Sequence, residues 1–513
     1  MGFHIDTGAF RVGVMTTEAG RHAYSLDDIR QRFDRCVGRT LGEIDSSNVF
    51  VRYAGKNKGI AGDVVEQSVL GYPADSRQEP DLEVDGMDVE LKVTGLKHNA
   101  RGDVVAKEPM SITAVSIDNI WSEEFETSTL WHKLEHLLVF YYLYEPRTTV
   151  EYDTADSGWK TVSTATSQYA SFPVMGWDLH EWTDEYRETL RTDWQIVRDY
   201  VRKVREENPD EEERKALWPL ISTKLNPQMM YLGTAPKYPN PPRFRLKNSV
   251  VTTMWKMAEG KSYERLPDEP SSFAELDARC RQITSEYAGR SVEEIANMVG
   301  YEGEVSKSIS ESVVVRMFGG ISKKMSRVEL FAMAGVSCKT IVLTSRGMRT
   351  EDMKLFRVDL DEVQDPDLAW EDSSFAAYFC ERQLLCPVFQ EPRDGCSFGE
   401  NVFRGFKRMA FPDGFIDTEA KRVWERMRHL VFAEELVDVI SCDADGNPRI
   451  NRKGNIVSAP NWPKSRDGIV FIRGGGGDSD DKTEVVNGVR MYRQSAWVKG
   501  SWMVNQLATI DYL

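Results

Sequence analysis

Asp81, Glu90 and Lys92 are the residues whose types and spacing most directly suggest chemistry. Two carboxylates suit Mg²⁺, which takes hard oxygen ligands and keeps water and phosphate oxygens in its remaining positions. A lysine beside them can orient or deprotonate an attacking water and offset the charge of a phosphate. The spacing Asp-x(8)-Glu-x-Lys also arises by chance, so a half-buried hairpin with a solvated polar face is the competing interpretation.

A β-hairpin would bring these three side chains together. The pair Asp85-Gly86 favours a two-residue turn, because that turn requires positive φ at both central positions. After the turn, apolar and polar residues alternate from residue 88 to residue 94, as they do in a half-buried strand. We therefore expect Glu90 and Lys92 on one face of the return strand and Asp81 on its partner.

Glu66 and Lys58 are candidates on the upstream side. Glu66 lies beside the apolar face of a helix expected over residues 60–70, which Gly71 would end. It is a third carboxylate of the metal site, a group that orients the lysine, or a surface glutamate. Lys58 lies in a glycine-containing loop, where a long cation reaches a phosphate or a base edge, or is simply solvated.

The surrounding elements predict a mixed α/β fold, because strands and helices alternate around the hairpin. Ser25 and Thr40 are good N-caps for two early helices. The pattern predicts a strand over 109–117, a capped helix running into a buried strand over 125–140, a loop over 151–172 and an amphipathic helix over 183–207.

Three cations, Arg243, Arg245 and Lys247, alternate with other residues in what is either a DNA-facing strand or a solvated edge strand. Residues 259–271 are polar and contain proline, which is typical of a domain boundary. We expect one domain over residues 1–260 and a second over residues 272–513.

Composition limits the class of protein. The chain has 513 residues, of which 41% are hydrophobic and 28% charged, and a net charge of −16. This charge argues against a non-specific nucleic-acid coat but allows a nuclease with a locally basic cleft. The longest apolar run, 137–144, is too short for a membrane span. Seven cysteines include no Cys-x-x-Cys pair, and the N-terminus has no signal region, so a reducing cytoplasm is expected.

A set of short motifs occurs in order along the first half. They are residues 38–44, Lys58-Gly59 with Gly62 and Glu66, Pro80-Asp81, residues 89–92, residues 126–128 with 132–134, and residues 244–248. In this set the chain resembles the MutH family of GATC-nicking endonucleases of mismatch repair, and their relatives among type II restriction enzymes, the Sau-3AI group.

The resemblance implies a fold and roles for individual residues. It implies a restriction-endonuclease-like fold of the PD-(D/E)XK type, with a mixed central sheet flanked by helices. Asp81 and Glu90 would hold Mg²⁺, Lys92 would be the catalytic lysine and Glu66 would support it. Lys133 would be a further active-site lysine. The Asp-to-Glu spacing is longer here than in MutH, and a longer hairpin would absorb the difference.

The second half is similar to the first, as in the Sau-3AI group. Residues 273–295 are similar to 26–44, 312–319 to 64–71, 335–342 to 86–93, 423–432 to 131–140 and 497–501 to 245–249. In this alignment the expected chemistry is lost: Val314 falls opposite Glu66, Leu330 near Asp81, Lys339 opposite Glu90, Ile341 opposite Lys92 and Glu425 opposite Lys133.

These observations predict a Mg²⁺-dependent type II restriction endonuclease that cuts double-stranded DNA and leaves 5′-phosphate ends. The resemblance suggests GATC as the site. It also suggests an allosteric second domain that binds another DNA site, and a dimer formed on DNA. The alternatives are a strand-specific nicking enzyme of DNA repair and a DNA-binding protein that does not cleave.

Overall fold

The structure is a computed structural model. It describes residues 15–16, 22–52, 59–73, 79–145, 149–153, 158–162, 166–237, 239–306, 309–349, 351–443, 445–450, 454–476 and 479–513. The chain forms two compact units, one of Met1–Lys97 with Met110–Thr183 and one of His98–Pro109 with Asp184–Leu513. Residues 184–260, expected in the first domain, thus belong to the second unit.

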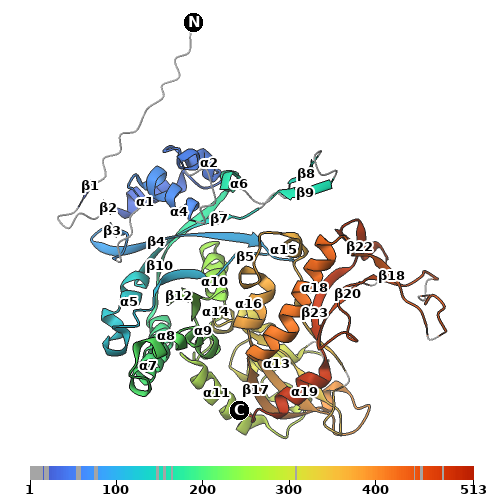
Figure 1. The fold of residues 1–513 in the computed structure, drawn as a ribbon. Helices are drawn as coiled ribbons and strands as arrows, with labels where there is room; N and C mark the ends of the chain where they lie inside the picture. Colours follow the sequence, from blue (N-terminus) through green and yellow to red (C-terminus); the bar gives the residue numbers. More distant parts are fainter. Residues whose placement is uncertain are drawn as a thin grey trace. The chain divides into compact units, whose positions relative to one another are not determined.

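A mixed sheet organises the first unit (Figure 1), with strand order β1-β2-β3-β4-β7-β10. β4 runs antiparallel to β3 and parallel to β7, and β10 is antiparallel to β7. The strands are β1 Met15–Thr16, β2 His22–Tyr24, β3 Leu82–Val84, β4 Met87–His98, β7 His136–Leu143 and β10 Val174–Glu181; the unit also contains β6 Met110–Ala114 and the pair β8 Thr149–Asp153 and β9 Gly158–Val162.

One face of this sheet packs on helices through an apolar core. Val89 and Leu91 of β4 and Phe140 of β7 are buried there with Ile29 and Phe33. The helical elements of the unit are α1 Leu26–Asp34, α2 Leu41–Ile44, α3 Val49–Arg52, α4 Ile60–Val64, η1 Val65–Leu70, η2 Ile120–Ser122, η3 Phe125–Thr127, α5 Thr129–Leu134 and α6 Thr166–Tyr169. Because side chains alternate along a strand, the opposite face carries Glu90 and Lys92.

Local signals in the sequence account for the ends of these helices. Ser25 and Ser128 cap α1 and α5 by accepting backbone N–H groups, and Thr40 forms a capping box with Glu43 on α2. Gly71 ends the predicted helix in the left-handed region, at φ 90°. That helix consists of α4 followed by the π-helical turn η1, which the apolar spacing does not predict.

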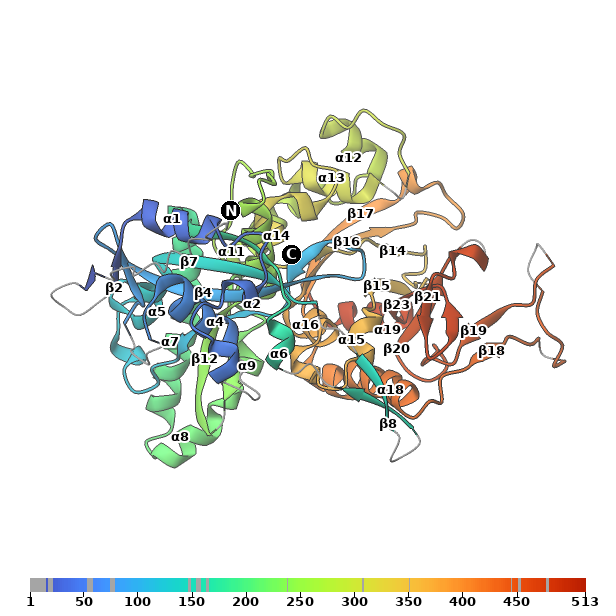
Figure 2. The same ribbon diagram turned by 90° about the horizontal axis from the view of Figure 1, so that it is seen from above.

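Several smaller sheets organise the second unit. β16 lies at the centre of one, parallel to β13 and β14 and antiparallel to β17, and β23 lies between β15 and β20 in another. The strands of these sheets are β11 Leu232–Lys237, β12 Asn240–Leu246, β13 Val336–Cys338, β14 Ile341–Leu343, β15 Met353–Arg357, β16 Gln383–Gln390, β17 Val402–Met409, β18 Asp438–Ile440, β19 Ser458–Pro460, β20 Val470–Gly475, β21 Glu484–Val486, β22 Val489–Met491 and β23 Arg493–Val498; the unit also contains β5 Val104–Ala106. Figure 2 shows β18 and β19 extending as a ribbon away from β20 and β23.

Helices accompany these sheets in the second unit; those that follow residue 359 share an apolar core with the sheets. The helices of the unit are α7 Asp184–Glu207, α8 Glu211–Leu217, α9 Pro219–Leu225, α10 Asn248–Ala258, α11 Phe273–Tyr287, α12 Val292–Met298, α13 Ser310–Met317, η5 Met325–Arg327, α14 Glu329–Met333, α15 Leu360–Gln364, η6 Trp370–Asp372, α16 Ser374–Glu381, η7 Phe398–Glu400, α17 Asp413–Phe415, η8 Ile416–Ala420, α18 Lys421–Phe432, η9 Ser479–Asp481 and α19 Gly500–Ala508. No helix among the described residues is both long and apolar enough to cross a bilayer.

The structure repeats one arrangement of backbone contacts, once near residue 40 and once near residue 291. The Gly38 N–H donates to the Val174 carbonyl at 2.9 Å, and the Val174 N–H donates back to Arg39 at 2.8 Å. In the second half the Gly289 N–H donates to Phe403, and Phe403 donates to Arg290, both at 2.9 Å.

The same helix start and strand irregularity follow in both halves. Ser291 and Glu294 form a capping box on α12, as Thr40 and Glu43 do on α2. Bulges lie at equivalent places, between Val174 and Gly176 in β10 and opposite Val388 and Phe389 in β17. We call residues 26–258 the first copy and residues 273–508 the second copy, after the predicted repeat; that they are two tandem domains of one fold stays a prediction.

Candidate active site

The register of the hairpin sets Asp81 against Glu90. Leu82 pairs with Val89 in the antiparallel ladder, so the next pair outward is Asp81 with Glu90. Asp81 Oδ2 also accepts the backbone N–H of Leu91 at 3.0 Å. The turn between the strands has φ 49° at Asp85 and 83° at Gly86, as the Asp-Gly pair predicts.

Glu90 is the centre of the site and is almost fully buried, with 1% of its surface exposed. Lys133 Nζ donates to Oε1 at 3.0 Å and to Oε2 at 2.8 Å, and Lys92 Nζ donates to Oε1 at 2.5 Å. Lys133 Nζ also donates to the carbonyl of Glu79 at 3.3 Å. A solvated polar face is therefore excluded, because a buried carboxylate is held by two ammonium groups.

The ionised form of Asp81 is disfavoured beside this cluster. Burial and, to a smaller extent, the negative charge of Glu90 together raise its pKa to about 6, although Lys92 and Lys133 act in the opposite direction. Neighbouring groups whose charged forms are disfavoured in this way are frequent at functional sites.

The donor set fits a divalent cation held partly by substrate. Among the described residues, no three His, Cys, Asp or Glu side chains gather as a complete metal site. Asp81 and Glu90 provide two opposed carboxylates, and Mg²⁺ usually takes one or two protein carboxylates together with waters and phosphate oxygens. A cation between them would remove the repulsion that raises the pKa of Asp81.

Glu66 is not part of a three-carboxylate cluster within the described residues. It is half-buried in η1, and its carbonyl accepts the backbone N–H groups of Gly71 at 2.8 Å and Tyr72 at 3.0 Å. Its predicted support of the lysine stays a prediction.

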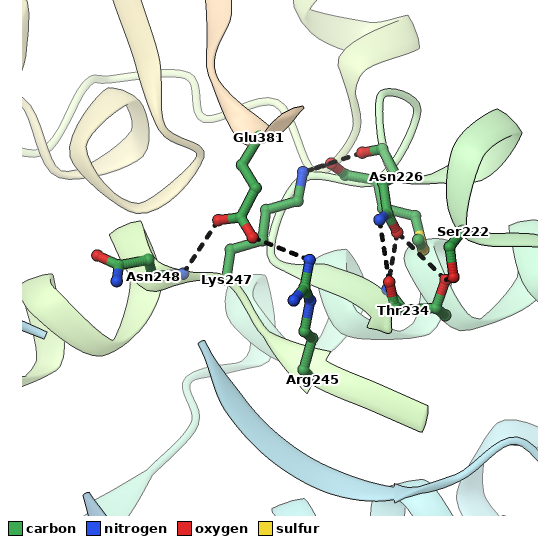
Figure 3. Close-up of polar contacts among 8 residues, drawn as sticks. Ser222, Asn226, Thr234, Arg245, Lys247, Asn248 and Glu381 are labelled. Atoms are coloured by element: carbon green, nitrogen blue, oxygen red, sulfur yellow. Dashed lines mark hydrogen bonds and ion pairs between the residues drawn. The ribbon is translucent and has the colours of Figure 1, made fainter. Parts of the chain in front are cut away.

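The predicted DNA-contacting cations have different environments. Lys58 lies outside the described residues. Arg243 is half-buried on β12, and Arg245, two positions further, forms an ion pair with Glu381 at 3.1 Å. Figure 3 shows the Arg245 guanidinium pointing toward Glu381. Contact of Arg243 with DNA stays a prediction, whereas Arg245 already has a protein partner.

The predicted contact of Lys247 with DNA is wrong. The sequence places this lysine among DNA-facing cations, but it is 1% exposed and its ammonium group donates to the carbonyls of Asn226, at 3.1 Å, and Met229. Burial lowers the pKa of Lys247 to about 8, while Asp193 acts in the opposite direction. A cation enclosed in this way cannot meet a phosphate without unfolding its surroundings.

Asp193 is the polar residue that the sequence interpretation missed. It is buried in α7 and accepts the backbone N–H groups of Met230, Tyr231 and Leu232 at 2.7, 2.7 and 2.8 Å. A signal was available, since Asp193 falls at helical spacing among the buried residues of α7, Leu190, Trp194 and Val197. An acidic residue on the apolar face of a helix indicates a buried polar partner.

Comparisons with known proteins agree with this geometry. Residues 70–170, which include Asp81, Glu90, Lys92 and Lys133, match the family described as "DNA mismatch repair enzyme MutH". The segment that contains the site is a MutH-like domain. The chain is also 20% identical over 93% of its length, and 97% of the other protein, to the type II restriction enzyme Sau3AI of Staphylococcus aureus. The predicted resemblance is confirmed.

The second copy can be compared with the MutH-like domain strand by strand. The shared bulge makes Tyr142 of β7 equivalent to Phe389 of β16. Glu90 pairs with Leu137, which lies five positions before Tyr142. Ser337 pairs with Leu384, which lies five positions before Phe389. Ser337 therefore occupies the position of Glu90 in the second copy.

The same register corrects two expected equivalences. Thr94 pairs with Tyr141, and Ile341 pairs with Val388, so Ile341 matches Thr94 and Lys339 matches Lys92. Lys339 was expected opposite Glu90 and Ile341 opposite Lys92, a shift of two residues along the strand. The second copy retains the lysine, but its ammonium group donates to the carbonyls of Lys354 and Leu355, at 2.8 and 3.0 Å.

A third equivalence, Glu425 with Lys133, is also wrong. In the MutH-like domain, η3 and the cap Ser128 lead into α5 and then β7. In the second copy, η6 and the cap Ser373 lead into α16 and then β16, whereas Glu425 lies in α18. Counting from the two caps places Tyr378 at the position of Lys133, whereas counting back from the paired strands places Cys380 there, because α16 is longer than α5; neither residue is a lysine.

Proposed function

We propose that the protein is a Mg²⁺-dependent endonuclease that cuts double-stranded DNA at a specific sequence, as the nuclease of a restriction–modification system. The observation that supports this most is the gathering of Asp81, Glu90, Lys92 and Lys133 within the segment that matches MutH. The likeness to a type II restriction enzyme over 93% of the chain supports the same activity.

The contacts of Asp81, Glu90, Lys92 and Lys133 support a role for each of these side chains, and the resemblance to MutH suggests one for Glu66. Asp81 and Glu90 would hold Mg²⁺, which when bound supplies Lewis-acid activation of water and neutralisation of phosphate charge. Lys92 orients or deprotonates the attacking water from its position beside Glu90. Lys133 fixes the Glu90 carboxylate and adds positive charge facing the scissile phosphate. Glu66 would support the lysine from η1.

The products would have 5′-phosphate and 3′-hydroxyl ends, since hydrolysis breaks the bond between phosphorus and the 3′ oxygen. GATC is the proposed recognition sequence, by likeness to the family. Recognition requires hydrogen bonds to base edges in the grooves, and phosphate contacts alone give affinity without sequence preference.

The second copy would bind DNA without cutting it. Its counterpart of Glu90 is Ser337, and its counterpart of Lys133 is Tyr378 or Cys380, so it cannot form an equivalent carboxylate–lysine site. We propose that residues 1–260 form the cutting domain and residues 272–513 an effector domain that binds another DNA site, with a dimer forming on DNA.

Plasmid digestion tests the proposed activity. The full chain is incubated with plasmids that contain or lack GATC, with Mg²⁺ or with EDTA, on methylated and unmethylated DNA, and the ends are sequenced. Cleavage of both strands at one sequence, with Mg²⁺ only, is the expected result. Nicks in one strand would favour a repair-type nicking enzyme. Sequence-specific binding with no cut at all would favour a DNA-binding protein that does not cleave.

A further inference from the structure

Glu381, at the end of α16 in the second copy, holds the last strand and helix of the first copy. Its carboxylate pairs with Arg245 of β12 at 3.1 Å and accepts the backbone N–H of Asn248 at 3.4 Å (Figure 3). Asn248 is the first residue of α10, where an acidic group also stabilises the positive end of the helix. The side chains of Glu381 and Arg245 are only 11% and 21% exposed.

A second contact fixes the same helix end. Ser249 Oγ donates to the carbonyl of Met333, at the end of α14, at 2.8 Å. Gly335 approaches this serine so closely that an added Cβ would lie 3.0 Å from Ser249 Oγ. The first turn of α10 is therefore held by two elements of the second copy.

α10 in turn clasps the segment that follows the catalytic strand. Asn248 Nδ2 donates to the carbonyl of Ala106 at 3.0 Å, and the Ala106 N–H donates to Thr252 Oγ1 at 3.0 Å. Ala106 is the last residue of β5, and the preceding turn is closed by Asn99, which accepts the N–H groups of Arg101 and Asp103.

This segment continues directly from β4, the strand that carries Glu90 and Lys92. β4 spans Met87–His98, and residues 98–109 belong to the second unit. The end of the catalytic strand is thus anchored where α10 and the second copy meet. Because reacting groups must be held within a fraction of an ångström, the anchoring of such a strand affects the chemistry.

We propose that Glu381 is a positioning residue for the cleavage site: it fixes the first turn of α10, which fixes residues 98–106 and so the far end of β4. This role rests on the proposed nuclease function, but its physical basis, the ordering of β4 by a residue of the second copy, does not. The second copy would thereby complete the cutting domain as a scaffold, independently of any DNA that it binds.

Hydrogen exchange followed by mass spectrometry tests this on the full-length protein without DNA. Glu381→Gln keeps the shape of the side chain and removes its charge. We expect exchange in peptides covering residues 87–106 to be at least about tenfold faster than in the wild type, because local opening becomes easier. The control is Glu435→Gln, whose ion pair with Arg426 is about half exposed on both sides. Unchanged exchange in residues 87–106 of Glu381→Gln would overturn the proposal.

Asn248→Ala keeps the test decisive if Glu381→Gln does not fold. It removes the bond to the Ala106 carbonyl and leaves the Arg245–Glu381 pair in place, and faster exchange is expected in residues 98–106 and in the adjoining end of β4. An exchange pattern identical to that of the wild type would show that the contacts of α10 with Ala106 do not hold residues 98–106.

Cleavage kinetics separate this proposal from the proposed function. With an active wild type, Glu381→Gln should lower kcat for DNA cleavage about tenfold and change KM less than threefold, because the catalytic strand moves and the DNA-binding surface does not. A wild type that cannot cleave DNA refutes the nuclease function, while the exchange data still decide whether Glu381 orders β4. A purely structural defect would instead lower the thermal midpoint without a selective change in β4.

Discussion

Asp81→Asn should stabilise the metal-free protein at neutral pH. Burial and the charge of Glu90 raise the pKa of Asp81 from 3.8 to about 6. Each pKa unit corresponds to about 1.4 kcal/mol, so a shift of about two units makes ionised Asp81 unfavourable by roughly 3 kcal/mol. Asparagine has no charge to bury and keeps an oxygen that can accept the Leu91 N–H.

The effect has a defined dependence on pH. Because folding raises the pKa, the folded protein binds the proton more tightly than the unfolded chain. The destabilisation is absent well below the ordinary value of 3.8, grows as the pH rises through the window up to about 6, and is constant above it. The difference between Asp81→Asn and the wild type should follow this curve.

Thermal unfolding in EDTA at a series of pH values measures the difference. For a unit of about 170 residues, roughly 3 kcal/mol raises the melting temperature by roughly 6–12 °C. Mg²⁺ should stabilise the wild type, through binding to the folded state, and stabilise Asp81→Asn far less. Asp88→Asn, at an exposed position on β4, is the matched control and should change stability by less than about 0.5 kcal/mol. Equal melting of Asp81→Asn and the wild type at pH 8 in EDTA would refute the reasoning.

Four further outcomes are expected. Glu90→Gln or Lys92→Ala should lower kcat by roughly 10²–10⁴-fold in plasmid digestion with the fold intact by circular dichroism, and wild-type turnover in either would contradict the mechanism. Lys339→Ala should keep kcat within about twofold, since its ammonium group donates to the carbonyls of Lys354 and Leu355; loss of cleavage would argue against a non-cutting second copy. Lys247→Met should lower stability by roughly 3–5 kcal/mol in denaturant unfolding and leave the salt dependence of DNA binding unchanged. Residues 1–260 alone should cut poorly. A fragment as active as the full chain would contradict the proposal that the second copy supports the cutting domain.

The hairpin and its neighbours could be predicted because their signals are local. Positive φ at Asp85 and Gly86 follows from residue type, and so do the caps at Ser25 and Thr40. The alternation after the turn correctly assigned the two faces of β4. What it could not supply was the burial of Glu90, which depends on Lys133 arriving from another element.

Long-range packing explains the wrong predictions. Lys247 lies in a strand-like run of alternating residues that also fits a solvated edge, and its bonds to the carbonyls of Asn226 and Met229, which lie outside that run, show that it is enclosed. The equivalences of Lys339, Ile341 and Glu425 depended on short similarities. Such similarities do not fix register, because a shift of two residues preserves which side chains share a face.

The break between β13 and β14 limits how the second copy could change. In the MutH-like domain one uninterrupted strand, β4, spans the equivalent positions. In the second copy the strand ends at Cys338 and resumes at Ile341, and the intervening Lys339 is turned to backbone carbonyls. Replacing Ser337 with glutamate would therefore not create a second cutting centre, because the backbone no longer presents the lysine beside it. Such a loss of activity would be difficult to reverse by point mutation. Under the proposed function the chain would then have a single cutting site per molecule, and cleavage of both DNA strands would depend on a second molecule or a second encounter.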